Sequence, residues 1–372
     1  METTDNLEKR QSELIKAMRF PLIVLVLYVH SIRPEAVPME WSLDGNNVFH
    51  IFTEIVSHYI GGLSLCWFFF FSGFLFYYNK KHQFGLHWVK GKYKRRVKSI
   101  LIPYIVWNLL NVAVILVVTS LFGWAGITVS RDPLDAVEKG PLYWFITGPI
   151  DFPLWYLREL IVLSILAPIF YYPVKKWPGI TLLVILGCYL AVFLGFDFFL
   201  FPSFSFFGLG AWMSIRKDNL VGICYRFRHS AFIGAVVTLA ITVIMYNYGY
   251  DNNAFLVFAP FGMVTFMNFC NWLYNHAHIK KWMLGLTETV FFIYASHEIF
   301  ILGWTKGAFL RLLGDSLWAQ WVSFLLVPIV TLVACLGLFY TLKRIIPEAV
   351  SFLCGFRTVH KINDSVSRRL YR

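Results

Sequence analysis

Long apolar segments are the feature that most constrains how this chain can fold. A helix that crosses a membrane needs about 20 residues, with a working range of about 17–25. Ten segments are long enough to span a bilayer or nearly so: 17–32, 58–78, 99–122, 154–172, 178–196, 199–215, 231–249, 254–274, 284–304 and 318–342. The fourth to sixth are short and closely spaced, so one of them could be re-entrant. The pattern predicts an all-α, polytopic membrane helix bundle with about ten transmembrane helices.

The composition agrees with a membrane protein. Hydrophobic residues make up 58% of the 372 residues and charged residues 15%, whereas soluble domains carry about 25% charged residues. The net charge of +12 would suit a nucleic-acid partner only if the basic residues gathered on one surface. They lie instead in short loops between apolar segments, so we exclude nucleic acid as a partner.

The basic loops also predict the topology. If the N-terminus is cytoplasmic, most Lys and Arg residues fall in the loops on that side, as the positive-inside rule requires. Both termini are then cytoplasmic, and the first apolar segment is a retained helix rather than a cleaved signal. We expect an integral-membrane domain over 1–345 and a basic cytoplasmic tail over 346–372. We expect membrane lipid around the bundle.

Two ionisable residues, Arg19 and His30, flank an almost wholly apolar stretch of the first segment. Eleven helical residues bring the side-chain direction round to within about 20° and rise about 16 Å, so both should face one cavity. Ionisable groups in membrane helices usually face a bundle interior or a water-filled path. A cation that holds an anion and a titratable base on one wall indicate group-transfer chemistry. The alternative is an interfacial Arg with a His that only packs between helices.

A second group of polar residues opens the fourth segment. Trp155 suits the membrane interface, and Arg158 and Glu159 follow it. Neighbours on a helix point about 100° apart, so these two need not pair, and we expect each to meet a different partner. All three are candidate substrate-binding residues. The alternative for the charged pair is a structural ion pair between helices.

Two further clusters lie inside apolar segments. Ser72 and Gly73 interrupt a run of phenylalanines, where small residues let a neighbouring helix or a substrate chain approach closely; the alternative is a plain packing notch. His297 and Glu298 lie side by side in the ninth segment, as a second proton-handling site or as a polar helix contact. Sequence neighbours do not face one another on a helix, so we do not expect a dyad. Ser72, His297 and Glu298 are candidate substrate-binding residues.

A basic run precedes the third segment and includes Arg95, Arg96 and Lys98. Such a cluster most often anchors a protein to anionic lipid, but it can also hold the phosphates of a large anionic cofactor. The six cysteines form no CxxC pair, and His276 and His278 have no Cys or carboxylate beside them. We therefore expect no disulfide framework and no metal site.

The chain resembles the integral-membrane acyltransferase-3 family. The resemblance covers about residues 15–300, and its motifs fall in the family's order. They are Arg19 and His30 with ten residues between them, the Phe-rich Ser-Gly segment from Phe68 to Phe74, the basic stretch from Lys94 to Tyr104, the segment from Leu154 to Leu157 with Pro168 after it, the segment from Phe206 to Gly210, and the segment from Phe291 to His297. The chain departs from the family in one place: many members have Arg-x-x-Arg where this chain has Arg95-Arg96-Val97-Lys98, and Lys lacks the bidentate phosphate contact of Arg.

The resemblance implies transfer of an acyl group, usually acetyl, from cytoplasmic acyl-coenzyme A to a hydroxyl of a cell-surface glycan or lipid-linked saccharide. It also implies a location in the bacterial cytoplasmic (inner) membrane. His30 would act as general base, and Arg19 would bind a phosphate of the donor or stabilise the developing oxyanion. An acyl-His intermediate is equally compatible with the sequence. Either Glu159 or Glu298 is a candidate to orient His30. The rival function is a secondary transporter or exporter of a polar or anionic solute, although the inverted repeats typical of transporters are not evident.

Overall fold

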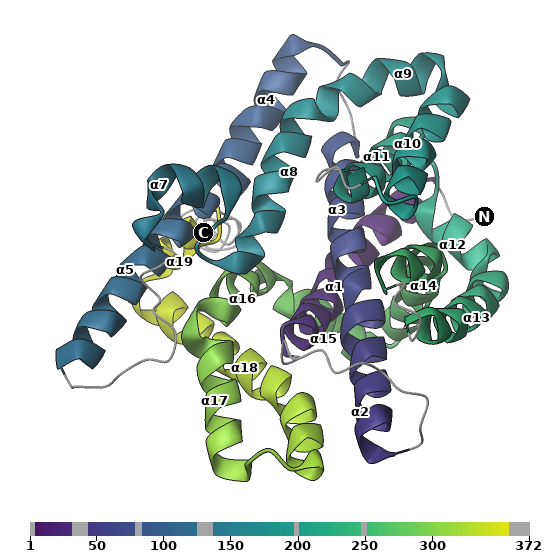
Figure 1. Ribbon diagram of the computed structural model, residues 1–372. Helices are drawn as coiled ribbons and strands as arrows, with labels where there is room; N and C mark the ends of the chain where they lie inside the picture. The colour runs from purple at the N-terminus through teal and green to yellow at the C-terminus, as the bar shows by residue number, and fades with distance from the viewer. Residues whose placement is uncertain are drawn as a thin grey trace.

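The computed structural model describes residues 4–31, 44–78, 84–124, 137–196, 201–246 and 251–356. Every regular element in these ranges is helical, which confirms the all-α prediction (Figure 1). The α-helices are α1 (Thr4–Val29), α2 (Gly45–Thr53), α3 (Gly61–Tyr77), α4 (Leu86–Arg96), α5 (Ile102–Trp124), α7 (Gly140–Leu142), α8 (Trp155–Leu166), α9 (Tyr171–Lys176), α10 (Pro178–Phe193), α11 (Phe201–Arg216), α12 (Leu220–Arg226), α13 (Arg228–Tyr246), α14 (Asp251–Tyr274), α15 (Ala277–Gly285), α16 (Val290–Ser296), α17 (Leu302–Leu313), α18 (Leu317–Ile345) and α19 (Pro347–Leu353).

Short helical turns of other types join several of these helices. The π-helical turns are η1 (Glu54–Ile60), η2 (Val97–Leu101), η3 (Tyr143–Thr147) and η7 (His297–Ile301). The 3₁₀ turns are η4 (Phe152–Leu154), η5 (Ala167–Phe170) and η6 (Leu286–Glu288). Isolated π-helical turns are rare and often occur at functional sites, so η7, which begins at His297, is of particular interest.

Five helical stretches in the described residues are long and apolar enough to cross a membrane. They are Gly45–Tyr77, Leu86–Trp124, Phe152–Lys176, Phe255–Tyr274 and Leu317–Ile345. A bent pair, Leu220–Arg226 with Arg228–Ile241, makes a sixth if its two parts, at 69° to each other, form one span. The chain is therefore an integral membrane protein. The count of about ten spans and the cytoplasmic termini stay predictions.

The other expected segments are helical but short or interrupted. In α1, Glu13, Lys16 and Arg19 leave only residues 20–29 as an uncharged stretch. Helix α10 is apolar but has 16 residues, and α11 has the same length. The segment expected at 284–304 is divided among the end of α15, η6, α16, η7 and the start of α17. Length and helix breaks therefore separate these segments from the five long spans.

Helix α1 lies inside the bundle, where it contacts α3, α14, α15, α16 and α18 (Figure 1). Leu14, Met18, Leu22 and Leu27 on this helix are fully buried. A helix surrounded by other helices on several sides places its polar residues in the interior of the protein. The position of α1 therefore determines what Arg19 can reach.

The Ser-Gly break in α3 is a point of close helix contact. A Cβ atom added to Gly73 would lie 1.9 Å from the carbonyl oxygen of Phe207 in α11. On the facing helix, a Cβ atom added to Gly210 would lie 2.1 Å from the carbonyl oxygen of Phe70. The two glycines let the backbones of α3 and α11 meet directly, as small residues do between membrane helices. Of the possibilities considered for this Ser-Gly break, the structure shows the close approach of a neighbouring helix.

The first part of the expected tail packs onto the bundle. Helix α18 ends at Ile345, and α19 follows it and contacts α5. The indole nitrogen of Trp107 donates a hydrogen bond of 3.0 Å to the carbonyl of Leu353, and Val350 and Cys354 are fully buried. Residues 357–372 of the expected tail lie outside the described residues.

All six cysteines are unpaired.

Gly73→Ala should destabilise the protein, because the new methyl group would collide with the backbone of α11 rather than with a movable side chain. Inserting a methyl group into packed structure costs about 1–3 kcal/mol. Gly337→Ala in α18 is the matched control, since a Cβ atom there meets nothing within 4 Å. Thermal unfolding in detergent should show a lower midpoint for Gly73→Ala and an unchanged or higher midpoint for Gly337→Ala. Equal midpoints would contradict the close α3–α11 contact.

Candidate active site

His30 occupies the end of α1, where the helix gives way to a turn. Its backbone N–H donates to the carbonyl of Val26 at 3.2 Å, and its own carbonyl accepts a hydrogen bond from Nζ of Lys306 in α17. The imidazole is 18% exposed and lies edge-on to the ring of Phe152, with centroids 6.2 Å apart. The backbone of His30 is therefore held in place while its ring stays accessible.

His297 faces His30 from the junction of α16 and η7. Its side chain is fully buried, and Nδ1 lies 2.8 Å from the carbonyl oxygen of Tyr294 and 3.1 Å from that of Ile293. Carbonyl oxygens only accept hydrogen bonds, so Nδ1 must carry the ring proton. In the neutral imidazole this leaves a lone pair on Nε2, which has no hydrogen-bond partner among the described residues. The backbone thus fixes the tautomer of His297.

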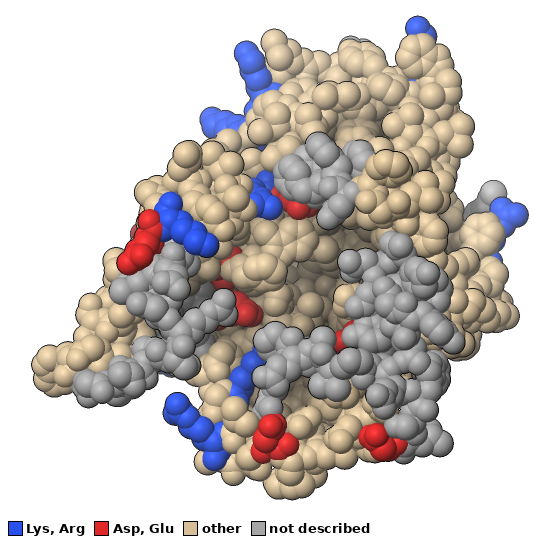
Figure 2. Space-filling view, in the orientation of Figure 1, with Lys and Arg blue, Asp and Glu red and all other residues tan. Residues whose placement is uncertain are grey.

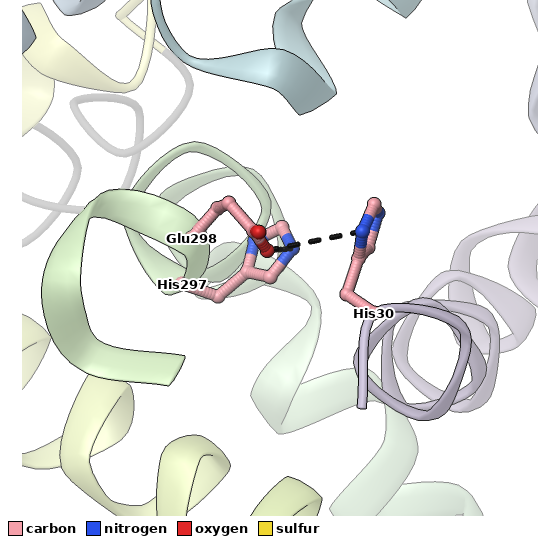
Figure 3. A group of neighbouring side chains, drawn as sticks. All are labelled: His30, His297 and Glu298. Carbon is pink, nitrogen blue, oxygen red and sulfur yellow. Dashed lines mark ion pairs between the residues drawn. The ribbon is translucent and has the colours of Figure 1, made fainter. Parts of the chain in front are cut away.

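The carboxylate of Glu298 lies close to the imidazoles of both His30 and His297 (Figure 3). Its Oε2 atom lies 3.8 Å from Nδ1 of His30 and 3.9 Å from Nε2 of His297, and the two imidazole centroids are 5.2 Å apart. The expectation that His297 and Glu298 would not face one another is wrong. The α-helix changes to a π-helical turn at His297, which alters the direction of successive side chains, and Glu is long enough to turn back toward the imidazole.

Arg19 and Arg96 form a second, cationic cluster. Arg96 donates hydrogen bonds to the hydroxyl of Ser72 at 3.1 Å and to its carbonyl at 3.0 Å. Both arginines are half-buried, and both are close enough to Tyr156 to interact with it electrostatically. Arg96 is also close enough to Arg19 for their positive charges to interact. Neither forms an ion pair with a described carboxylate. Two inward-facing cations without an anion make a suitable place for an anionic group.

Arg19 and His30 lie toward one segment of the chain. Arg19 is near Tyr156 at the start of α8, and the ring of His30 contacts Phe152 in η4. Because η4 leads directly into α8, the two side chains border neighbouring parts of one wall. This is the arrangement that their spacing on a helix predicts.

The remaining candidates for binding the donor or the acceptor are distributed around this wall. Arg95 and Lys98 are exposed, and Lys98 lies over the ring of Phe356 at 6.0 Å. Ser72 holds Arg96. Trp155 is half-buried, with its ring centroid 6.5 Å from that of Phe69. Of the three cofactor candidates, only Arg96 turns toward the interior.

Arg158 and Glu159 have different partners, as expected. Arg158 donates hydrogen bonds to the carbonyls of Ile146, at 3.2 Å, and Thr147, at the end of η3. Glu159 is buried and hydrogen-bonded to Ser203 in α11. The carboxylate beside His30 is therefore Glu298 and not Glu159.

Sequence reasoning missed two charged residues near the site. Asp151 is 3% exposed and is close enough to Asn111 and Glu298 to interact electrostatically with both. Lys306, which lies between the ninth and tenth expected segments, is in α17 and is electrostatically close to both His297 and Glu298. The available signal for Asp151 was its position directly before an apolar span. Nothing in the local pattern around Lys306 points to His30.

The molecule is hollowed at the centre of the face shown in Figure 2, over the region between α1, α8 and α16 in Figure 1. Acidic and basic side chains gather at the edges of this hollow, whereas most of the surrounding surface is uncharged (Figure 2). A hollow with a few charged groups in an apolar surface is the usual form of a binding site.

Comparison with known proteins identifies the family. The sequence profile described as "Acyltransferase domain", of the acyltransferase-3 family, matches residues 13–340. The chain belongs to this acyltransferase family. The chain is also similar to the Succinoglycan biosynthesis protein ExoH of Rhizobium meliloti (strain 1021), with 26% identity over 166 residues. That alignment covers 42% of this chain and 43% of ExoH, so the chain matches less than half of the relative's length. No solved structure matches the chain.

Proposed function

We propose that this acyltransferase moves an acyl group, acetyl in the first instance, from cytoplasmic acyl-coenzyme A to a hydroxyl of a cell-surface or lipid-linked saccharide. The observation that carries the proposal is the placement of His30 beside Glu298 at the end of a helix that also presents Arg19. Family membership supports acyl transfer, and the name of the relative ExoH supports a glycan acceptor.

His30 is the proposed general base, and Glu298 orients it. If Nδ1–H of His30 donates to Oε2 of Glu298, the lone pair of His30 lies on Nε2 and is free for the acceptor hydroxyl. Nδ1 of His30 and Oε2 of Glu298 are 3.8 Å apart, which is longer than a hydrogen bond. Catalytic contacts of this kind commonly shorten only when substrate binds. This division of roles between an imidazole and a carboxylate is the one used in catalytic triads.

The reaction balances with these groups alone. The acceptor oxygen forms a bond to the thioester carbonyl carbon while His30 Nε2 takes the hydroxyl proton. The carbon–sulfur bond then breaks, and the leaving thiolate recovers that proton from the imidazolium. In the alternative route His30 itself takes the acyl group first and passes it to the acceptor. Both routes need the same imidazole at the same place.

The donor's phosphates fit the cationic cluster. Arg19 and Arg96 point inward without a described carboxylate partner, and Ser72 holds the guanidinium of Arg96. Arginine suits phosphate because its planar fork donates two parallel hydrogen bonds. The rise of about 16 Å from Arg19 to His30 is comparable to the length of a pantetheine arm, so a donor held at the arginines can present its thioester at His30.

The acceptor side has an exposed aromatic residue. Phe152 is 64% exposed although it is apolar, and its ring adjoins the His30 imidazole. An aromatic face beside a base can pack against the apolar face of a sugar ring and aim one hydroxyl at Nε2. We therefore place the acceptor between Phe152 and His30, with Trp155 at the edge of the same wall.

Acetyl transfer from radiolabelled acetyl-coenzyme A to an extract of surface glycans, without any ion gradient, tests the function. His30→Ala should lower the rate by about 10²–10⁴, the usual contribution of a general base, and Glu298→Gln should also lower it strongly. Glu288→Gln is the matched control, because Glu288 is a similarly exposed carboxylate that pairs with Lys343. Equal labelling by the wild type and His30→Ala, at equal folded protein, would remove His30 as the base.

The donor site has a separate test. Arg96→Ala should raise KM for acetyl-coenzyme A by about 10–100-fold, since a hydrogen bond to a charged group contributes about 1.5–3 kcal/mol. Arg95→Ala should change KM much less, because Arg95 is exposed to solvent. Arg96→Lys keeps the charge but loses the fork, so its KM should fall between those of the wild type and Arg96→Ala. If Arg95→Ala and Arg96→Ala have the same KM, the inward-facing cluster does not bind the donor.

A further inference from the structure

We propose that His30, His297 and Glu298 form a reversible binding site for one Zn²⁺ ion, and that the bound ion stops His30 from acting as a base. Metal binding itself does not depend on the acyl-transfer reaction and is measured without donor or acceptor. Only the inhibitory effect rests on the proposed function.

The three ligand atoms already lie close together (Figure 3). One ligand atom from each of the three residues lies within 4.8 Å of those of the other two. Oε2 of Glu298 is 3.8 Å from Nδ1 of His30 and 3.9 Å from Nε2 of His297. Tetrahedral Zn²⁺ with bonds of about 2.0–2.1 Å holds its ligands about 3.4 Å apart. A shift of roughly 0.5 Å in the Glu298 side chain would bring it within that distance of each imidazole.

The buried imidazole is oriented as a metal ligand would be. Nδ1–H of His297 donates to backbone carbonyls, so Nε2 presents its lone pair to Glu298. Metal-ligating histidines almost always give their other ring N–H to a carbonyl, a carboxylate or a water in this way. Nε2 of His297 and Oε2 of Glu298 are both buried acceptors without a hydrogen-bond partner in the described chain. Two buried acceptors that face each other are stabilised by a cation between them.

The donor set selects the metal. Two imidazoles and one carboxylate are the protein ligands of many zinc sites that keep a fourth position open. Mg²⁺ and Ca²⁺ prefer oxygen ligands and are not expected to bind. Lys306 is electrostatically close to His297 and Glu298, and its positive charge opposes a permanent ion. The site should therefore take up Zn²⁺ reversibly.

Binding at His30 has a direct chemical consequence. The neutral imidazole has one N–H, and coordination through Nδ1 requires that hydrogen to be on Nε2. The lone pair that would accept the acceptor proton is then absent. Zn²⁺ also occupies Glu298, the carboxylate that otherwise orients His30. An ion at this site therefore blocks both parts of the proposed base.

Zinc binding to metal-free, detergent-purified full-length protein tests the site, with titration calorimetry as the measurement. The reference protein carries His276→Ala and His278→Ala, which removes an exposed histidine pair on α15 and the turn before it. We expect one Zn²⁺ per chain, no binding of Mg²⁺, and affinity lowered about tenfold or more by either His297→Ala or Glu298→Gln, since even a supporting partner contributes about 10–100-fold. Glu298→Gln keeps the side-chain shape, which guards against a folding defect in His297→Ala.

Several results would overturn the zinc site. They are no binding by the reference protein, affinity unchanged by both substitutions, or binding by the unmodified chain that disappears once His276 and His278 are replaced. In the transfer assay, half-maximal inhibition should occur at the Zn²⁺ concentration that half-saturates binding, and a chelator should reverse it. Saturation of the site without inhibition would refute the blocking role. If no transfer is found at all, the proposed function fails while calorimetry still decides the metal site.

Discussion

The burial of α1 at the centre of the bundle is the constraint on which the candidate site depends. A charged or titratable group surrounded by apolar helices is costly unless other polar groups meet it. The same helix carries Arg19 and His30 into this interior. Other parts of the chain must therefore provide polar partners at two places along α1, one near each residue. It does so with Tyr156 and Arg96 near Arg19, and with Glu298 and the Lys306 contact at the end that carries His30.

The cationic end relies on a contact that contains no charge. The backbones of α3 and α11 meet at Gly73 and Gly210, and α3 also packs against α1. Ser72, next to Gly73, is then in position to hold the guanidinium of Arg96 through its hydroxyl and its carbonyl. A side chain at either glycine would separate the helices and displace Ser72. The phosphate-binding capacity proposed for Arg96 thus depends on the packing of two glycines.

Sequence periodicity predicted the local part of this arrangement. Regular helix geometry was enough to place Arg19 and His30 toward one wall. The small residues at Ser72 and Gly73 indicated the close approach of either a helix or a substrate chain. The choice of Glu298 over Glu159 as the neighbour of His30 depends on how distant helices pack, which local pattern does not contain. The Glu298–His297 contact was missed for a different reason: the prediction assumed α-helical geometry, whereas a π-helical turn begins at His297.

The fixed tautomer of His297 determines which hydrogen bonds His30, His297 and Glu298 can form with one another. Nδ1 of His297 is committed to backbone carbonyls, so this imidazole has no proton to give to Glu298. Of the two histidines, only His30 can donate an N–H to the shared carboxylate, and that donation leaves its lone pair on Nε2. A cation between all three groups satisfies the same atoms differently and removes that lone pair. The same geometry thus allows an active base and a metal-blocked state, and what lies between the imidazoles determines which one is present.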